Sequence, residues 1–243
     1  MTKAPVDRDL IHATHESGDS HAIMLNKLRA GVLGANDGIV SVAGMVMGVA
    51  GATTDSFAIL VAGVAGLSAG ALSMAVGEFV SVSAQRDSER ALLEKEVWEL
   101  ENLPEQELAE LAGLYEAKGL TPDLARQVAT QLTDHNALAA HAEVELGIDP
   151  NELVNPWHAA WTSMFAFVLG ALIPLLAMVL TPPDIRVWAT VAAVIGSLVF
   201  TGVFSARVGR APTLPAVVRV VAGGIAAMGI TYAIGALVGV GIG

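Results

Sequence analysis

The sequence contains no cysteine among its 243 residues, which excludes disulfide bonds, thiolate metal sites and cysteine nucleophiles. Charged residues are also scarce, at 15% of the chain against 53% hydrophobic residues, and the mean hydropathy is +0.59. Such a composition is too apolar for an ordinary soluble domain. Any metal site in this chain must use oxygen, imidazole or thioether ligands.

Long stretches of the sequence lack charged side chains, and a run of about 18 such residues is a candidate membrane span. Asp37 shortens the first run. We therefore predict an all-α integral membrane protein whose five transmembrane helices lie in a lipid bilayer. The runs cover residues 38–54, 56–77, 159–183, 187–206 and 220–243.

The net charge of −11 is concentrated in residues 85–152, which hold 16 of the 24 acidic residues but only 5 of the 13 basic ones. A polyanionic segment argues against nucleic acid as a partner and fits a cation. We predict a three-helix acidic cytoplasmic domain inserted between transmembrane helices 2 and 3. The predicted parts are a polar tail (1–26), helices 1 and 2 (27–84), the acidic domain (85–155) and helices 3 to 5 (156–243).

Proline and glycine residues predict the helix ends within the acidic segment. Pro104 ends the continuation of the second span and begins the next helix, which Gly119 follows. A third helix is expected from Thr121, as a side-chain cap, to Gly147.

Lys and Arg residues gather at one set of span ends, which predicts the orientation of the chain. We expect the N-terminus and residues 85–155 in the cytoplasm and the C-terminus outside. Arg186 is the one basic residue at the opposite ends.

Two carboxylates lie within or near the first two spans, where no Lys or Arg offsets them. Asp37 and Glu78 are each eight residues from a basic residue at the cytoplasmic edge, which is roughly 12 Å at the helical rise. Met74 is one turn deeper than Glu78. Because an ionised carboxylate in the bilayer costs about 2.5–3.5 kcal/mol, we predict a transport pathway at Asp37, Met74 and Glu78. The alternative is that Asp37 caps or kinks a helix next to Gly38, that Glu78 merely extends toward the membrane surface, and that Met74 fills space in the packing.

The acidic segment also contains ligand-type side chains that share helix faces. Each pair has a spacing of three or four residues, and like charges at that spacing destabilise a helix unless a cation lies between them. Such ligands suit Fe²⁺, Mn²⁺ or Zn²⁺, although a solvated acidic surface explains the spacing equally well. A ferritin-type ferroxidase is not indicated, because Glu-x-x-His is absent. The pairs are Glu96 and Glu99, Glu107 and Glu110, and His141 and Glu145.

Two further patterns leave alternatives open. The histidines of the tail suggest either metal delivery or merely a polar tail. The small-xxx-small glycine pairs support either packing within the chain or dimerisation. The tail residues are His12, His15, Glu16 and His21, and the pairs are Gly44/Gly48, Gly66/Gly70 and Gly235/Gly239.

Four features together resemble the vacuolar iron transporter family, in its bacterial branch. They are "GANDGIVS", "GALSMAVGEFVSV", the acidic insert and "ELGIDPNELVNPW", so the resemblance runs from about residue 26 to the C-terminus. It implies a homodimer of five-span subunits with the path at their interface, and proton-coupled export of Fe²⁺ from the cytosol. It also implies a plasma-membrane location if the protein is bacterial.

The resemblance also implies roles for individual residues. Asp37 and Met74 match the pore residues of the family, whereas Gly66 stands where plant members have a pore glutamate, which Glu78 would replace. His141 stands where the family can use methionine, which favours harder ions. An Mn²⁺ exporter and a metal sensor without transport remain alternatives, and we do not expect an enzyme. The matched cytoplasmic ligands are Glu96, Glu99, Glu107, Glu110 and Glu145.

Overall fold

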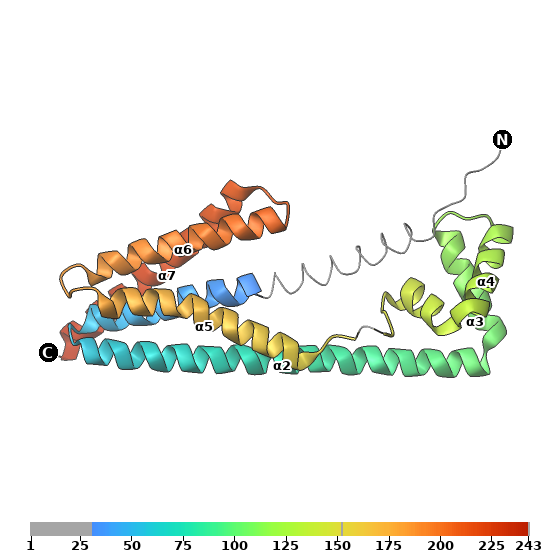
Figure 1. The fold of residues 1–243 in the computed structure, drawn as a ribbon, viewed down its shortest axis with the longest axis horizontal. Helices are drawn as coiled ribbons and strands as arrows, with labels where there is room; N and C mark the ends of the chain where they lie inside the picture. The colour runs from blue at the N-terminus through green and yellow to red at the C-terminus, as the bar shows by residue number, and fades with distance from the viewer. Residues whose placement is uncertain (1–30, 152, 243) are drawn as a thin grey trace. The chain divides into compact units, whose positions relative to one another are not determined.

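A computed structural model describes residues 31–151 and 153–242 of the chain. The predictions for the tail of residues 1–26, with His12, His15, Glu16 and His21, lie outside the described residues. The described part is helical (Figure 1). Its elements are a first helix Gly31–Ala52, α2 Ser56–Asn102, α3 Pro104–Ala117, α4 Pro122–His141, the π-helix η1 Ala142–Leu146, α5 Pro156–Leu180, α6 Arg186–Val208 and α7 Thr213–Ile242.

Five of the described helices are long and apolar enough to cross a membrane, which confirms the predicted number. They are the first helix, α2, α5, α6 and α7. The ends of these helices differ from the ends of the uncharged runs in the sequence, because a single charged residue does not end a helix. Asp37 and Arg219 both lie inside helices, and α2 extends over 47 residues.

The chain divides into two compact units. One contains the described residues up to Glu78 and those from Trp157 onward, and the other is Phe79–Pro156. Helix α2 contributes to both, and each unit is described by itself below.

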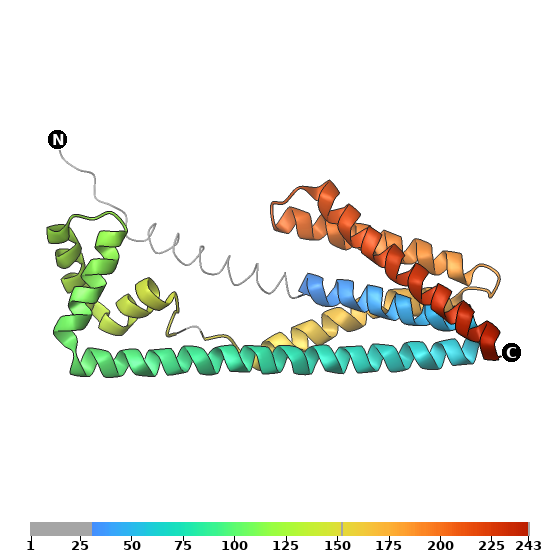
Figure 2. The same ribbon diagram turned by 180° about the vertical axis from the view of Figure 1, so that it is seen from behind.

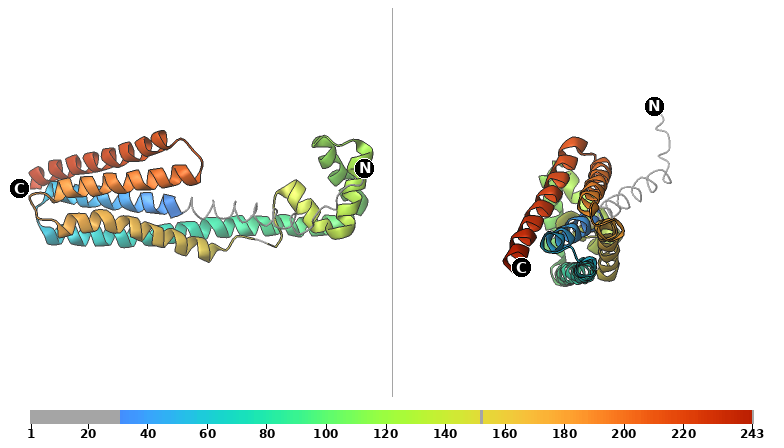
Figure 3. Two further views of the ribbon diagram at one scale, coloured as in Figure 1. Left: turned by 45° about the horizontal axis from the view of Figure 1, so that its top comes forward. Right: turned by 90° about the vertical axis from the view of Figure 1, so that its left-hand side faces the viewer.

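The first helix is the central element of the apolar unit. Its side chains Val42, Ala43 and Val46 are completely or almost completely buried. They share one core with Phe167 of α5 and Leu198 of α6. Figures 2 and 3 show this helix, in blue, beside α5, α6 and α7. Every other span of this unit therefore packs around the first helix.

Glycines permit this central position because they let helix backbones touch. A Cβ atom at Gly38 would collide with the backbone carbonyl oxygen of Phe167 in α5, and one at Gly235 of α7 would collide with that of Gly48. Gly66 and Gly70 of α2 likewise face the side chains of Met45 and Phe167. The glycine pairs of the sequence thus serve packing within the chain.

A buried arginine holds one end of the apolar unit together. Arg186 at the start of α6 is 4% exposed. Its guanidinium donates to the Ser56 hydroxyl at 3.0 Å and to the Thr54 carbonyl at 2.8 Å. The Asp55 carboxylate accepts a hydrogen bond from the Phe57 amide at 2.9 Å and thereby caps α2. Arg186 therefore has a structural role besides its place in the charge pattern.

Exposed tryptophans lie at both ends of the apolar helices. Trp157 and Trp161 are on one face at the start of α5, and Trp188 is near the start of α6, after the chain has crossed the unit through α5. Trp161 also stacks on Phe165 with ring centroids 5.9 Å apart. Amphipathic rings at both ends are typical of anchors at membrane–water interfaces.

The Phe79–Pro156 unit is built from the end of α2, α3, α4 and η1. Pro104 begins α3, Gly119 follows it with φ +100°, and Gly147 ends η1 with φ +66°, as predicted. The predicted cap by Thr121 is wrong in one respect, because Thr121 occupies the N-cap position but its side chain makes no capping hydrogen bond. The prediction of one continuous third helix is also wrong. Helix α4 is interrupted at Asn136, and the segment after it ends in the π-helix η1.

The close contact between the first helix and α7 predicts a difference between two substitutions in α7. Gly235→Ala should destabilise the protein by about 1–3 kcal/mol, because its methyl group meets rigid backbone. Gly229→Ala is the matched control, since a Cβ there has nothing within 4 Å and alanine favours helix. Thermal unfolding in detergent measures both, and equal melting temperatures would contradict this account of the packing.

Candidate metal centre

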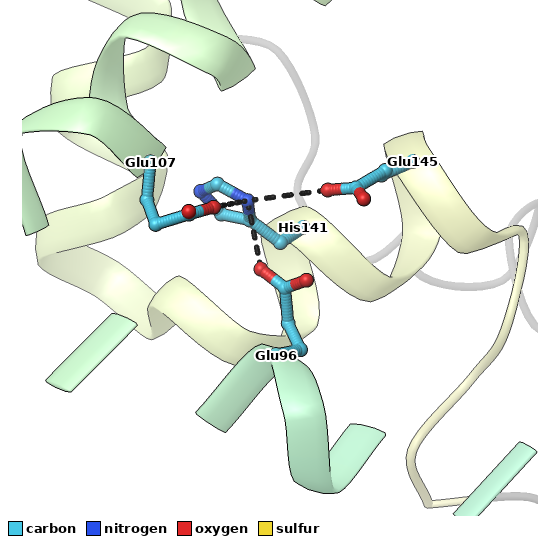
Figure 4. A group of neighbouring side chains, drawn as sticks. All are labelled: Glu96, Glu107, His141 and Glu145. Carbon is cyan, nitrogen blue, oxygen red and sulfur yellow. Dashed lines mark ion pairs between the residues drawn. The ribbon is translucent and has the colours of Figure 1, made fainter. Parts of the chain in front are cut away.

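Four ligand-type side chains converge in the Phe79–Pro156 unit. Glu96 comes from α2, Glu107 from α3, His141 from the end of α4, and Glu145 from η1 (Figure 4). One ligand atom from each lies within 4.8 Å of all the others. Helices that are separate in sequence therefore bring three carboxylates and one imidazole to a single point.

The imidazole of His141 lies at the centre of this group. Its Nδ1 atom is 3.0 Å from a carboxylate oxygen of Glu96, 3.7 Å from one of Glu107 and 3.8 Å from one of Glu145. The side chains of His141 and Glu96 are 0% and 3% exposed, and that of Glu145 is 26% exposed. Three ligands are thus buried, and the fourth borders solvent.

Several polar atoms of this group are buried without a hydrogen bond. They include both ring nitrogens of His141 and the Glu96 oxygen nearest to the ring. A buried polar atom that lacks a partner costs about 1–3 kcal/mol, so native proteins rarely contain several together. A cation held between the carboxylates and Nδ1 would satisfy the Glu96 oxygen and Nδ1, because both can donate an electron pair to it, whereas Nε2 would carry the proton of the neutral ring.

Burial and mutual repulsion raise the pKa of two of the carboxyl groups. For Glu96 the pKa rises to about 7, mainly by desolvation and further by the negative charges of Glu145, Glu107 and Glu99. For Glu107 the pKa also rises, first by desolvation and then by Glu110. Both groups lie beyond the apolar part of α2. A proton would therefore compete with any metal ion for the Glu96 carboxylate near neutral pH.

The donor set indicates which ions fit. Three carboxylates and one imidazole suit borderline first-row divalent ions such as Fe²⁺, Mn²⁺ and Zn²⁺. The histidine disfavours Mg²⁺ and Ca²⁺, which prefer oxygen ligands. The partly exposed Glu145 is the member of the group that lies on the solvent side.

Two of the predicted ligands lie outside this group. Glu99 forms an ion pair with Lys95 at 2.6 Å, and Glu110 is exposed. Both still act on the group electrostatically, because their charges raise the pKa of Glu107. The structure therefore brings together four of the six side chains that the sequence predicted.

The predicted pathway residues lie in the apolar unit. Asp37 is exposed on the first helix, and its carboxylate accepts a hydrogen bond from the Ser41 hydroxyl at 2.7 Å. Met74 of α2 packs partly buried against the apolar core, and Glu78 is half-buried. It stays a prediction that these three side chains lie at a similar depth in the membrane and form a transport pathway.

Sequence reasoning missed two residues beside Asp37. Ser41 and Met45 follow it at four and eight residues and are exposed like it. The Met45 thioether lies over Gly66 of α2, where any Cβ would collide with the sulfur atom. The signal was the helical spacing from Asp37, which places all three side chains on one face.

The chain is similar to a family of known proteins. A family model described as "VIT family" matches residues 28–236. The chain is 44% identical over 227 residues to a protein named "Vacuolar iron transporter" from Acanthamoeba castellanii, covering 90% of this chain and 83% of the relative. It is 36% identical over 213 residues to "VIT-like transporter 1b" from Glycine max, covering 87% of this chain and 76% of the relative. It is also 36% identical over 213 residues to "Vacuolar iron transporter homolog 4" from Arabidopsis thaliana, covering 87% of this chain and 84% of the relative.

These relatives are eukaryotic, so assignment to a bacterial branch stays a prediction. The match of the family model covers the first helix, α2, α5, α6 and most of α7, together with the unit that contains the four ligand-type side chains. The chain belongs to the VIT family.

Proposed function

We propose that this protein exports Fe²⁺ from the cytosol across a membrane in exchange for protons. The observation that carries the proposal is the buried group of Glu96, Glu107, His141 and Glu145, whose donor set suits Fe²⁺. It occurs in a chain with five helices able to cross a membrane. The names of its relatives identify them as iron transporters.

The two sets of acidic residues would act in sequence. The buried group collects the ion on the cytosolic side, and Asp37 receives it within the membrane, with Met74 and Glu78 as further pathway ligands. A carboxylate binds either a metal ion or a proton, so departure of one favours arrival of the other. This competition is the simplest basis for antiport.

A second copy of the chain would complete the path. Asp37, Ser41 and Met45 are exposed in the single chain, and a carboxylate facing lipid is costly. Pairing two copies through this face would remove the carboxylates from lipid and place them around a shared path. In this arrangement the N-terminus and residues 85–155 face the cytosol and the C-terminus lies on the other side.

Two alternatives keep the same metal group. Mn²⁺ is a substrate that the same ligands accept. A sensor that binds metal without transport is favoured by one observation, namely that the whole buried group belongs to the Phe79–Pro156 unit, whereas the first helix, α5, α6 and α7 belong to the apolar unit. The membrane would be the plasma membrane in a bacterium, or a vacuolar membrane as in the names of the relatives. We propose no catalytic activity.

Metal binding by the buried group predicts that two glutamates of α3 behave differently. Glu107→Gln should weaken Mn²⁺ binding at least tenfold, because it removes a buried ligand. Glu105→Gln removes the same charge from an exposed position of the same helix and should change affinity less than twofold. Calorimetric titration of the purified full-length protein measures both. Equal losses would indicate a diffuse acidic surface in place of a site.

The raised pKa of Glu96 predicts opposite pH effects on stability and on metal binding. The folded state holds a proton on Glu96 up to about pH 7, whereas an unfolded glutamate loses it near its usual value. The metal-free protein should therefore lose stability as pH rises from about 4.5 to 7. Mn²⁺ affinity should increase as pH rises toward 7, because loss of the proton frees the Glu96 carboxylate for the metal. Glu96→Gln should abolish this part of the stability change, and an unchanged melting profile would refute the assignment.

The transport proposal predicts that flux depends on Asp37. Inside-out proteoliposomes with an outward-directed proton gradient should accumulate Fe²⁺ with the wild-type protein and lose at least nine-tenths of this flux with Asp37→Asn, because the amide neither binds the cation nor exchanges a proton. Asp184→Asn, in an exposed loop, is the matched control and should transport normally. Metal binding without flux in the wild type would favour the sensor.

A further inference from the structure

Helix α4 is interrupted at Asn136. The backbone there is extended, with φ −162° and ψ 95°, while the residues on both sides are helical. Any amino acid can adopt this conformation, so the break has no steric need for asparagine. The side chain supplies the specific feature, because its amide oxygen accepts a hydrogen bond from the backbone N–H of Ala139 at 3.1 Å.

This hydrogen bond is an N-cap. Asn136 stands three residues before Ala139, and an asparagine oxygen that binds the third N–H of a following helix starts that helix. The segment that begins here runs through His141 and η1 to Gly147. Asn136 therefore marks where the chain leaves the direction of α4 and begins a new helical segment.

The new segment carries two of the four ligand-type side chains, His141 and Glu145, whereas Glu96 and Glu107 come from α2 and α3 (Figure 4). Its direction therefore decides whether the two pairs meet. Ala140 packs in the small core of the unit, and Ala142 is fully buried. The cap fixes the residue at which the segment starts, and the burial of these two alanines fixes which face of the segment packs against the rest of the unit.

We propose that Asn136 is a positioning residue for the metal site, an inference that rests on the proposed metal-binding function. The capping hydrogen bond stabilises the non-helical backbone at Asn136. Without an acceptor at position 136, helix formation through this position is favoured, most of all with alanine. A continuous helix would carry His141 along the axis of α4 and away from Glu96.

The first test compares substitutions at this one position. Asn136→Ala should weaken Mn²⁺ binding to the full-length protein about tenfold, a loss typical of residues that orient ligands. Asn136→Ser and Asn136→Asp keep an acceptor for the cap and should bind within threefold of the wild type. If all three bind as the wild type does, or if Ser and Asp lose as much as Ala, the proposal is overturned.

A double-mutant cycle separates positioning from a general loss of stability. Because Asn136 acts through the segment that carries His141, Asn136→Ala should cost at least threefold less affinity in a His141→Ala background than in the wild type. Full additivity of the two losses in Mn²⁺ affinity would contradict positioning through His141.

A measurement without metal separates this inference from the proposed function. The chain has no cysteine, so Glu105→Cys and Glu143→Cys, both at exposed positions, can carry spin labels on α3 and η1. Asn136→Ala should shift or broaden the label distance in the metal-free protein, and Asn136→Asp should preserve it. An unchanged distance overturns the positioning role. A shifted distance in a protein that binds no Mn²⁺ upholds the role and rejects the metal function.

Discussion

An ionised carboxylate that is shielded from water must find a partner, and this constraint governs both parts of the molecule. In the Phe79–Pro156 unit, Glu96 and Glu107 are buried beside a histidine ring with which they form no hydrogen bond. In the apolar unit, Asp37 has the hydroxyl of Ser41 as a partner. Within the described residues, no Lys or Arg forms an ion pair with Glu96, Glu107 or Asp37, and the nearby Lys95 pairs with Glu99. This is why we propose that both places bind a cation or a proton.

The apolar packing determines where the intramembrane carboxylate points. Gly38 and Gly48 bring the first helix against the backbones of α5 and α7, so those faces of the helix are filled. Asp37 lies on a different face, with Ser41 and Met45. Larger residues at the glycine positions would separate the helices. The glycines thus fix the rotation of the helix that carries Asp37, on which the proposed transport path depends.

Much of the fold could be predicted because the responsible signals are local. Uncharged runs identify the five long helices, and Pro104, Gly119 and Gly147 mark helix ends through their own backbone preferences. The site was harder, since helical spacing shows which side chains share a face but not which helices meet. Glu99 was expected to be a ligand, yet Lys95 one turn away pairs with it. The break at Asn136 was missed because asparagine is tolerated within helices and its capping role appears only in three dimensions.

A transport protein must release its ion as well as bind it, and the proposed metal site has two features that favour release. Glu145 borders solvent and belongs to a five-residue π-helix, a conformation that is rare and often found at functional sites. The pKa of Glu96 lies at about 7, so this carboxylate accepts a proton at little cost when the metal leaves. A fully ionised and rigid set of ligands would bind more tightly and release more slowly. In the proposed metal site, the burial that raises the pKa of Glu96 thus favours reversible binding near neutral pH.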